Sequence, residues 1–370
     1  RIAARLERWF REHQRELPWR RRYHPYHVWI SEVMLQQTRM DVVLGYYKRF
    51  VKRFPTIGAL ARASDEEVLA LWSGLGYYRR AKMLRAGAIE VTERFRGKLP
   101  DDAETLRTIP GIGRYTAGAI ASIAYGKREA IVDGNVARVV ARLFAIPHAV
   151  PSRTFVDASW REAEALVAAA RSPRDLNQAL MEHGARVCKP RNPSCDSCVV
   201  ARFCRAAAKG DPVSYPRRQR LKRSVRLSIP LYIVMDGRGK LLMRKESGSL
   251  MEALYHLPHG SSELFGECAP DRFHPGERLG AFLHTVTHRR IEFEVVSATL
   301  DSAVAEGPSE YAWIDPVELA SLPHPSYVRK AMEVLATVSS RRDARDDVAA
   351  EVPPPLPPRY ARGRSRRDDR

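Results

Sequence analysis

Two carboxylates in this chain occupy positions where an acidic side chain can do chemistry. Glu32 lies in VWISEVMLQQT, where nearly every neighbour is apolar or uncharged. Burial among such neighbours raises the pKa of a carboxyl toward the range of a general acid, whereas an exposed turn of a helix would leave it ordinary. Asp133 follows an apolar run and precedes a predicted helix, so we expect it to cap that helix. A carboxylate fixed at a helix start can also stabilise a positive charge that develops nearby.

A glycine-rich turn, IPGIG, precedes Asp133 in the chain. It places Gly111 and Gly113 between two segments that are compatible with helices. Glycines tolerate positive φ angles and leave backbone N–H groups uncovered, so a phosphate group can approach them. The turn therefore predicts contact with a nucleic-acid backbone that does not read bases, with an ordinary connection between helices as the alternative.

Four of the five cysteines fall within 17 residues, which indicates a metal centre. They are Cys188, Cys195, Cys198 and Cys204, with the spacing C-x6-C-x2-C-x5-C. Zinc ribbons use two short CxxC pairs, so this spacing favours an iron–sulfur cluster over a structural zinc ion but leaves both open. Basic residues surround the quartet, and we expect the metal to hold a phosphate-facing loop in shape. Cys268 lies far from the quartet and is interpreted as a structural thiol.

The elements that position these residues are predicted to be helices. Between residues 1 and 210, short segments with the apolar spacing of a helix are separated by Pro or Gly, which predicts an all-α domain. The clearest of these segments span residues 28–44, 66–72, 81–95 and 117–124. Residues 211–226 contain two prolines, dense charge and no apolar face, so they are expected to form an exposed basic linker.

After the linker the apolar spacing changes to two, which predicts strands. Residues 227–338 are expected to form an α+β domain, closed by a helix over residues 325–338. Its predicted strands are a hairpin of residues 228–235 and 240–244 around a turn at 236–239, and a long strand or strand pair over 289–300. Residues 339–370 alternate Arg with Asp and then become proline-rich, which predicts a disordered tail.

The charge of the chain is strongly positive and unevenly distributed. The formal net charge is +19; residues 1–210 hold 37 Lys and Arg against 21 Asp and Glu, while residues 227–338 hold 10 against 15. A basic half is typical of phosphate binding; acidic lipids would attract the same charge, but no amphipathic anchor is evident. No apolar run has the length of a membrane span or of a signal core. We expect a soluble, cytoplasmic and nucleoid-associated bacterial protein that binds nucleic acid.

Seven motifs follow one another along the chain: LPWR (17–20), SEVMLQQT (31–38), GLGYY (74–78), PGIGRYTAG (110–118), VDGN (132–135), LMEHGA (180–185) and the cysteine quartet. Together they resemble the motifs of the adenine DNA glycosylases of the MutY type, within the helix-hairpin-helix DNA glycosylase superfamily. The resemblance implies a multidomain protein, with an all-α helix-hairpin-helix glycosylase domain over residues 1–210 and a nudix-like α+β lesion-recognition domain over residues 227–338. It also implies that the loop at residues 188–204 holds a [4Fe-4S] cluster.

The resemblance assigns catalytic roles to four residues. Glu32 would protonate a ring nitrogen of a flipped adenine, and Asp133 would stabilise the oxocarbenium-like sugar or form a transient covalent adduct with it. Tyr115 and Asn135 would support the intermediate and the attacking water. Bifunctional enzymes that resemble endonuclease III carry a lysine at the position of Tyr115, whose amine forms a Schiff base with the sugar. Tyrosine has no such amine, which predicts a monofunctional glycosylase with little or no lyase activity.

The resemblance also implies a set of base contacts. Arg20 would line the adenine pocket, and Glu182 would hold the exocyclic amine of adenine. Tyr77 would act as a wedge beside the damaged guanine, and Leu75 would enter the base stack with it; packing at a helix end is the alternative for both. The further base contacts implied by the resemblance are Gln37 and Thr38.

The C-terminal domain resembles the nudix-like domain with which this family recognises 8-oxoguanine opposite the adenine. A nudix hydrolase needs a glutamate-rich helix that holds magnesium, and the sequence GSSELFGECAPDRF lacks it, so recognition is favoured over hydrolysis. The family probes the lesion with a Phe-Ser-His turn, which corresponds here to Val286, Thr287 and His288. Thr287 can still donate a hydrogen bond, but valine cannot stack as phenylalanine would. We therefore expect recognition of 8-oxoguanine at altered strength.

These features predict a DNA glycosylase of base excision repair that removes adenine mispaired with 8-oxoguanine or guanine. Its expected partner is double-stranded DNA that contains such mispairs, and we expect a monomer without a membrane partner. Two alternatives stay open: an oxidised-pyrimidine or mismatch thymine glycosylase on the same scaffold, and a non-catalytic DNA-binding protein. Tyr115 and Glu182 weigh against the first alternative, and the pair Glu32 and Asp133 weighs against the second.

Overall fold

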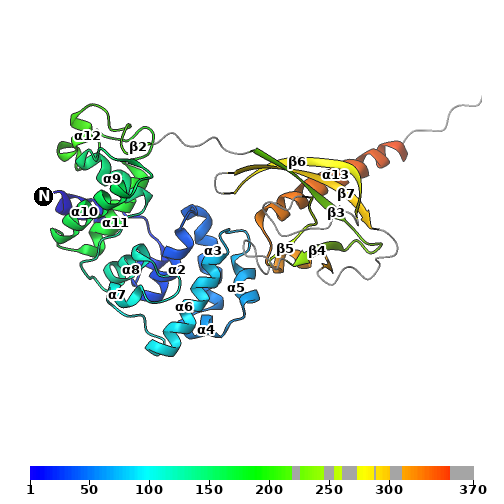
Figure 1. Ribbon diagram of the computed structural model, residues 1–370, viewed down its shortest axis with the longest axis horizontal. Helices are drawn as coiled ribbons and strands as arrows, with labels where there is room; N and C mark the ends of the chain where they lie inside the picture. Colours follow the sequence, from blue (N-terminus) through cyan, green and yellow to red (C-terminus); the bar gives the residue numbers. More distant parts are fainter. Residues whose placement is uncertain (219–225, 246–253, 261–272, 287–288, 301–310, 351–370) are drawn as a thin grey trace, which may run out of the picture.

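The computed structural model describes residues 1–218, 226–245, 254–260, 273–286, 289–300 and 311–350. It consists of a helical part, which accounts for the described residues up to about 210, and a smaller part with strands that follows it (Figure 1). Among the described helices, none has both the length and the apolar character needed to cross a membrane.

The helical part contains twelve α-helices among the described residues. They are α1 (Ile2–His13), α2 (Pro25–Leu35), α3 (Met40–Arg53), α4 (Ile57–Arg62), α5 (Asp65–Trp72), α6 (Arg79–Phe95), α7 (Ala103–Leu106), α8 (Arg114–Ala119), α9 (Gly134–Phe144), α10 (Arg153–Ala168), α11 (Pro173–Arg186) and α12 (Arg205–Ala208). A π-helical turn, Ile120–Ala124, extends α8. The prediction of a helical fold for this part is correct.

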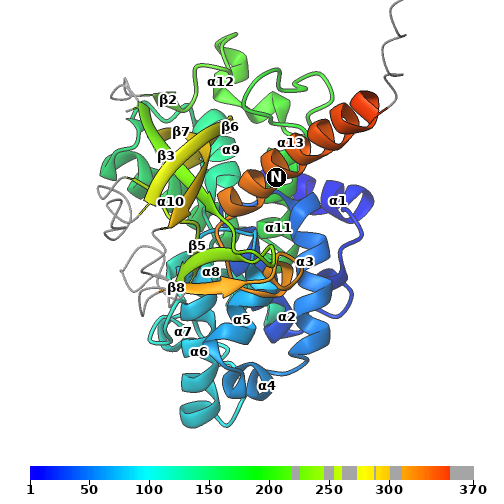
Figure 2. The same ribbon diagram turned by 90° about the vertical axis from the view of Figure 1, so that its right-hand side faces the viewer.

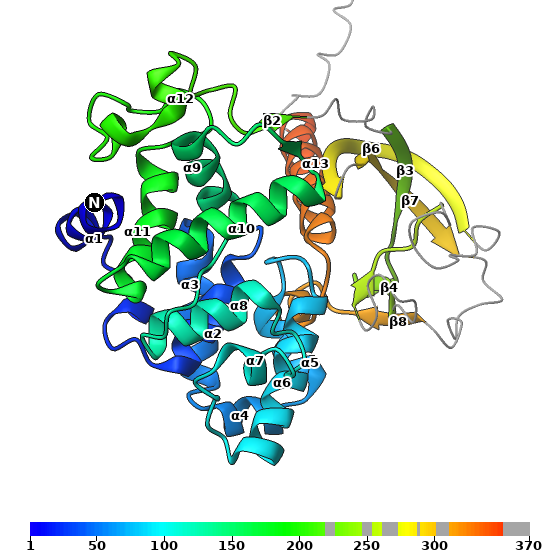
Figure 3. The same cartoon turned by 60° about the vertical axis from the view of Figure 1, so that its left-hand side comes forward.

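These helices bury two separate hydrophobic cores. One core is formed by the helices from α2 through α8 and includes Trp29, Phe50 and Trp72. The other joins α9, α10 and α11 to the N-terminal helix α1, which contributes Leu6 and Phe10. Figure 3 shows α1 beside α11, so the start of the chain packs on a segment more than 150 residues away. The boundary between the two cores is where the candidate site lies.

The predicted helix over residues 28–44 is instead two helices. α2 ends at Leu35, and the backbone leaves the helical region at Gln36 before it turns left-handed at Gln37, with φ +57°. α3 then begins at Met40. The intervening sequence contains neither Pro nor Gly, so no local signal marked the break. Tertiary contacts stabilise the break, because the side chain of Arg80 donates hydrogen bonds to carbonyl groups that the helix end leaves unpaired.

The strands of the C-terminal part form two three-stranded sheets. In the first, β7 (Arg289–Leu300) lies between β3 (Arg226–Val234), to which it is parallel, and β6 (Phe273–Val286), to which it is antiparallel. In the second, β4 (Leu241–Lys245) lies between β5 (Tyr255–His256) and β8 (Tyr311–Ile314). Helix α13 (Ser326–Ala350) packs along the first sheet, as Figure 2 shows. The prediction of an α+β arrangement and of a long strand over residues 289–300 is correct.

The predicted hairpin around residues 236–239 is only partly correct. The turn forms, with hydrogen bonds from the backbone N–H of Asp236 to the Lys240 carbonyl and from Gly239 to Asp236. The strands on either side join different sheets, however, and a single bridge between Met235 and Leu241 connects them. The long strand β7 offers β3 nine consecutive pairing positions, which a short local partner cannot match.

Two predictions about irregular segments are also corrected. The first half of the predicted linker packs on the helical part, because β2 (Arg217–Arg218) pairs with β1 (Ala149–Val150) and Tyr215 is buried. Residues 219–225 lie outside the described residues. The prediction of disorder is wrong for residues 339–350, where α13 continues to Ala350 through a stretch that lacks Pro and Gly. The rest of the tail, residues 351–370, also lies outside the described residues.

The helical and strand-containing parts contact each other at the loop between α5 and α6. The Ser73 and Tyr78 hydroxyl groups both donate hydrogen bonds to the backbone carbonyl of His324. Beside this contact, Lys245 forms an ion pair of 2.7 Å with Glu66. The loop that carries Tyr77 is therefore held in part by the C-terminal half of the chain.

Candidate active site

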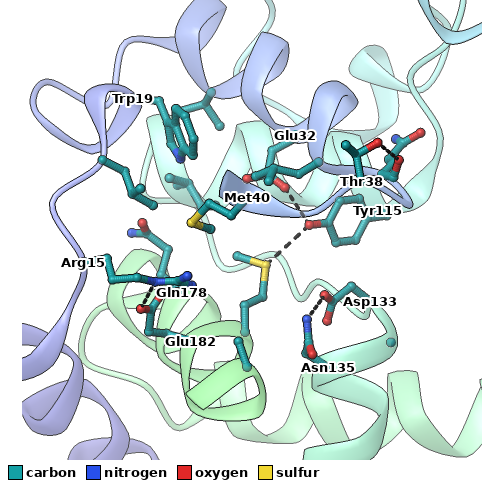
Figure 4. Close-up of a pocket in the computed structure, with 18 of the residues that line it drawn as sticks. Arg15, Trp19, Glu32, Thr38, Met40, Tyr115, Asp133, Asn135, Gln178 and Glu182 are labelled. Atoms are coloured by element: carbon teal, nitrogen blue, oxygen red, sulfur yellow. Dashed lines mark hydrogen bonds and ion pairs between the residues drawn. The ribbon is translucent and has the colours of Figure 1, made fainter. Parts of the chain in front are cut away.

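A cavity of about 790 Å³ opens between the two cores of the helical part. The end of α2, the loop after it, α8, the start of α9 and one face of α11 line this cavity. Figure 4 shows Glu32 and Tyr115 on one side of the space, with Asp133 across from them and Glu182 on a third side. The predicted site residues that line the cavity are Arg20, Glu32, Gln37, Thr38, Tyr115, Asp133, Asn135 and Glu182. Arg15 and Ala185, which are 170 residues apart in the chain, both line it, so distant segments meet at one place.

Glu32 is buried on α2, with 4% of its surface exposed, because α2 is apolar on almost every face. The hydroxyl of Tyr115 donates a hydrogen bond of 2.6 Å to its Oε2. Burial raises the pKa of Glu32 to about 7; the Tyr115 hydrogen bond opposes this rise, the charge of Asp133 adds to it, and Arg20 again opposes it. The carboxyl therefore holds a proton near neutral pH and can deliver it to a leaving group.

Tyr115 stays a neutral hydroxyl in this environment. Burial, reinforced by the nearby carboxylates of Glu32 and Asp133, raises the pKa of Tyr115 well above its ordinary value. Its oxygen also lies 3.4 Å from the sulfur of Met181 on α11. Tyr115 therefore orients the carboxyl of Glu32 as a hydrogen-bond donor rather than as a base.

Asp133 caps α9, as the sequence predicted, and both of its carboxylate oxygens are held. Oδ1 accepts a hydrogen bond of 2.7 Å from the Val136 backbone N–H, and Oδ2 accepts one of 2.9 Å from the Asn135 side chain. The Asn135 amide oxygen in turn accepts from Arg138, 2.9 Å away, whose Nε donates to the carbonyl of Cys188. A continuous chain of hydrogen bonds thus connects the carboxylate to the cysteine loop.

Glu182 lies on α11 with 1% of its surface exposed, and two arginines neutralise it. Arg15 donates to both of its carboxylate oxygens, at 2.5 and 3.0 Å, and Arg20 donates to Oε2 at 3.0 Å. Burial alone would raise the pKa of Glu182, but the hydrogen bonds and charges of the two arginines outweigh it and hold that pKa below its usual value. Arg20 also donates to the Gln178 amide oxygen at 3.0 Å. This wall therefore offers a ligand several hydrogen-bonding groups close together.

Sequence reasoning missed three polar residues of this region. Arg15 precedes the LPWR motif and had no motif of its own. Gln178 stands four residues before Glu182, so it shares the same helix face, and Arg138 stands three residues after Asn135. Helical spacing from a known site residue would have found the last two.

The cavity combines a proton donor, a fixed carboxylate and apolar walls. The apolar walls include Trp19, Val28, Met40 and Met181. A planar aromatic ring fits between such walls, and its edge can reach the polar groups around Glu182. A protonated carboxyl on one side and a carboxylate on the other are what the cleavage of a glycosidic bond requires.

The predicted contacts outside the cavity differ in exposure. Tyr77 is 47% exposed and has φ +53°, so its ring is available to a ligand. Leu75 is instead buried, at 6% exposure, in the core formed by helices α2 through α8, which agrees with the alternative of packing at a helix end; its entry into a base stack stays a prediction. Apolar character alone could not separate these two outcomes. The predicted lesion readers Thr287 and His288 lie outside the described residues, as does Cys268.

The glycine turn forms between α7 and α8, as predicted. Gly111 has φ +78°, and a Cβ atom there would lie 2.9 Å from the Cβ of Met83, so glycine is required. Gly113 is exposed and stands at the N-cap of α8, where no side chain caps the helix. The first N–H groups of α8 are therefore open to a phosphate, and phosphate contact stays a prediction.

The cysteine quartet lies around one small cavity between α9 and α12. The sulfur of Cys188 accepts a hydrogen bond of 3.3 Å from the buried side chain of Arg142, and the Cys204 thiol donates to the Arg142 carbonyl at 3.3 Å. None of the four is in a disulfide. Within the described part of the chain, no three Cys, His, Asp or Glu side chains are close enough to share a single metal ion.

Comparison with known proteins places the chain in a family. The sequence profile of the HhH-GPD superfamily of base excision DNA repair proteins matches residues 30–161. The adenine DNA glycosylase of Rattus norvegicus is 36% identical over 360 residues, which cover 79% of this chain and 69% of the relative. The chain belongs to the adenine DNA glycosylase family. The resemblance inferred from the seven motifs is thereby confirmed.

Other members of the family and of the fold agree with this assignment. The adenine DNA glycosylase of Homo sapiens is 51% identical over 208 residues, or 54% of this chain; the match spans 38% of the length of that relative. A solved structure of a thermostable thymine-DNA glycosylase is 27% identical with a TM-score of 0.51, covering 56% of this chain and 95% of that one. The helical glycosylase fold expected for an adenine DNA glycosylase is therefore confirmed.

Proposed function

We propose that the protein is a DNA glycosylase of base excision repair that hydrolyses the N-glycosidic bond of adenine mispaired with 8-oxoguanine or guanine. The observation that carries the proposal is the hydrogen-bonded pair of the buried Glu32 and the partly buried Tyr115, which faces Asp133 across a cavity that accommodates a base. Membership in the adenine DNA glycosylase family supports the choice of adenine. Double-stranded DNA with such a mispair is the proposed partner, bound by a monomer.

In this proposal the flipped adenine enters the cavity with its polar edge toward Arg20, Gln178 and Glu182. Glu32 donates its proton to a ring nitrogen, and the bond between that base and the sugar breaks, with the electron pair leaving on the adenine. Asp133 stabilises the sugar cation or adds to it transiently. Water then adds to the sugar carbon, and its proton returns to the carboxylate of Glu32, which restores the enzyme.

We further propose that base removal occurs without deliberate strand cleavage. Cleavage through a Schiff base needs an amine that can attack the sugar. No lysine is among the described residues that line the cavity, and the hydroxyl of Tyr115 is engaged with Glu32. Borohydride is therefore expected to trap only a small amount of covalent protein–DNA adduct.

We propose that the cysteine quartet holds a [4Fe-4S] cluster. All four cysteines line one small cavity, so their side chains lie near one another in the fold. Their spacing, C-x6-C-x2-C-x5-C, lacks the two short CxxC pairs of a zinc ribbon and favours an iron–sulfur cluster. When bound, the cluster would supply an electron-transfer group and would hold the loop in shape. Arg142 and Arg138 are the residues that join this loop to α9.

The C-terminal part is proposed to be a nudix-like reader of 8-oxoguanine. β6 ends at Val286, which pairs with Arg289 at the start of β7. The proposed readers Thr287 and His288 stand between these two residues in the sequence and lie outside the described residues. Whether these readers discriminate the lesion can be tested with Thr287→Ala and His288→Ala. An unchanged preference for 8-oxoguanine:A over G:A would remove both residues from the reader.

One assay tests the proposed function against both alternatives. Release of the base is measured under single-turnover conditions on duplexes that contain 8-oxoguanine:A, G:A or G:T. We expect adenine release from the first two and none from the third, with Glu32→Gln inactive. Release of thymine from G:T would favour the thymine glycosylase, and binding without release from any duplex would indicate a non-catalytic protein.

A further inference from the structure

Arg80, at the start of α6, lies where three segments near the candidate site meet. Its Nη1 donates hydrogen bonds to the backbone carbonyls of Val33 at 2.7 Å and Met34 at 3.2 Å, and to that of Gln36. These carbonyls belong to the end of α2, directly after Glu32 in the chain. The guanidinium thereby binds the negative end of the helix that carries the proposed acid.

The other nitrogen of the same guanidinium reaches the two loops that face the DNA in the proposed function. Nη2 donates to the Gly76 carbonyl at 3.1 Å and to the Thr38 hydroxyl at 3.4 Å. The guanidinium carbon also lies over two aromatic rings, 5.5 Å from the centre of Trp72 and 5.3 Å from that of Tyr77. One side chain thus contacts the proposed wedge Tyr77 and the loop of Gln37 and Thr38 at once.

We infer that Arg80 is a positioning residue, which fixes the wedge loop at residues 73–78 and the loop at residues 36–39 relative to the helix of Glu32. The inference rests on the proposed function, because it assigns Arg80 to the same excision reaction. It predicts that insertion of Tyr77 beside the mispair and presentation of the flipped base to Glu32 depend on one guanidinium.

Two features of the backbone show why such a residue is needed. Gln37 and Tyr77 both have left-handed φ angles, +57° and +53°, although neither is a glycine. Side chains other than glycine adopt this region rarely, so the conformation persists only where surrounding contacts hold it. Arg80 contacts the residue on each side of Gln37 and both Gly76 and Tyr77, so it supplies these contacts for both loops.

An arginine suits this place for a geometric reason. Its planar fork points five N–H donors in fixed directions, and its flat faces stack on aromatic rings. A lysine ammonium keeps the charge, but it cannot reach the carbonyls at the end of α2 and the Gly76 carbonyl at the same time. It also has no flat face that could stack on the rings of Trp72 and Tyr77. Burial lowers the pKa of Arg80 to about 10, so the group still carries its charge at neutral pH.

The test compares Arg80→Met and Arg80→Lys with Arg79→Met, a control that removes the same charge from the exposed neighbouring position on α6. Full-length protein is first checked for its unfolding temperature by circular dichroism. Single-turnover excision is then measured with enzyme in excess on 8-oxoguanine:A and G:A duplexes. A 2-aminopurine beside the 8-oxoguanine reports unstacking by Tyr77. The rate constant is the decisive quantity, because a partly unfolded sample lowers the amplitude of product and not the rate constant.

We expect Arg80→Met to lower the rate constant by about 10- to 100-fold, in keeping with the cost of misplacing a reacting group by about 1 Å. Arg80→Lys should lower it by an intermediate factor, and the 2-aminopurine signal should fall in both. Arg79→Met should stay within about twofold of wild type. Rate constants for both Arg80 variants within about twofold of Arg79→Met would overturn the inference; if Arg80→Met does not fold, Arg80→Lys alone decides. An inactive wild type would instead refute the proposed function.

Discussion

Glu32→Gln should abolish base excision and, at alkaline pH, make the protein more stable. The carboxyl is buried, and its pKa is raised from 4.5 to about 7, mainly by that burial. A group whose pKa is higher in the folded state contributes stability that is complete below the unfolded pKa and is lost as the pH rises through the folded one. Above about pH 7 the folded protein must therefore hold an ionised carboxylate in a poorly hydrated place. The neutral amide of Gln avoids this cost and still accepts the hydrogen bond from Tyr115.

The size of the effect follows from the pKa difference. A difference of about 2.5 units corresponds to about 3 kcal/mol, because each unit is worth about 1.4 kcal/mol. Below the unfolded pKa the wild type and the variant should have similar free energies of unfolding. The gap should open as the pH rises and reach about 3 kcal/mol, in favour of the variant, above about pH 8. All other titrating groups are common to both proteins and cancel in the comparison.

Denaturation with urea at several pH values measures this gap, and the pH dependence of excision by the wild type provides an independent check. The single-turnover rate should fall as the pH rises above about 7, since the protonated fraction of Glu32 then declines. A stability gap that does not change between about pH 5 and pH 8 would refute the reasoning. So would a wild-type rate that is constant from about pH 6 to pH 9.

Three further perturbations follow from the same site. Tyr115→Phe removes a hydrogen bond that lowers the pKa of Glu32, so that pKa should rise and the alkaline limb of the pH–rate profile should move to higher pH. An unchanged alkaline limb would contradict the role of Tyr115 as the hydrogen-bond donor to Glu32. Asn135→Ala removes the amide that orients Asp133 and should slow excision by about 10- to 100-fold, measured under single turnover, with DNA affinity nearly unchanged. Gly111→Ala forces a Cβ against α6 at φ +78°, so the free energy of unfolding should drop by about 1–2 kcal/mol or more, and DNA affinity should fall; full stability would show that the turn can relax.

Much of the candidate site could be predicted because its residues stand in short motifs with local physical meaning. The apolar surroundings of Glu32 already indicated burial, and burial is what raises its pKa. The position of Asp133 between an apolar run and a helix indicated an N-cap, which the structure contains. The two glycines of IPGIG indicated a turn, and Gly111 has the positive φ that glycine allows there. Each of these features depends on a few neighbouring residues.

Other parts of the site could not be predicted because they depend on which segments meet. No motif indicated that Arg15 would pair with Glu182, 167 residues later, or that Arg80 would bind the carbonyls at the end of α2. Leu75 and Tyr77 stand two residues apart in one motif, yet one is buried and the other exposed. The residue types of a motif do not predict in which direction each side chain of a turn points.

The sequence by itself determined the family, the helical character of the first 210 residues, the burial of Glu32 as the candidate proton donor, the capping carboxylate and the four cysteines. Tertiary structure decided where α2 ends, which sheet each strand joins, how far α13 continues and which side chains surround each carboxylate. The physical reason is how far apart in the sequence the interacting residues lie. Helix caps, turns and apolar periodicity reflect interactions over a few residues, whereas the break after Leu35 and the neutralisation of Glu182 require partners that only the folded chain brings together.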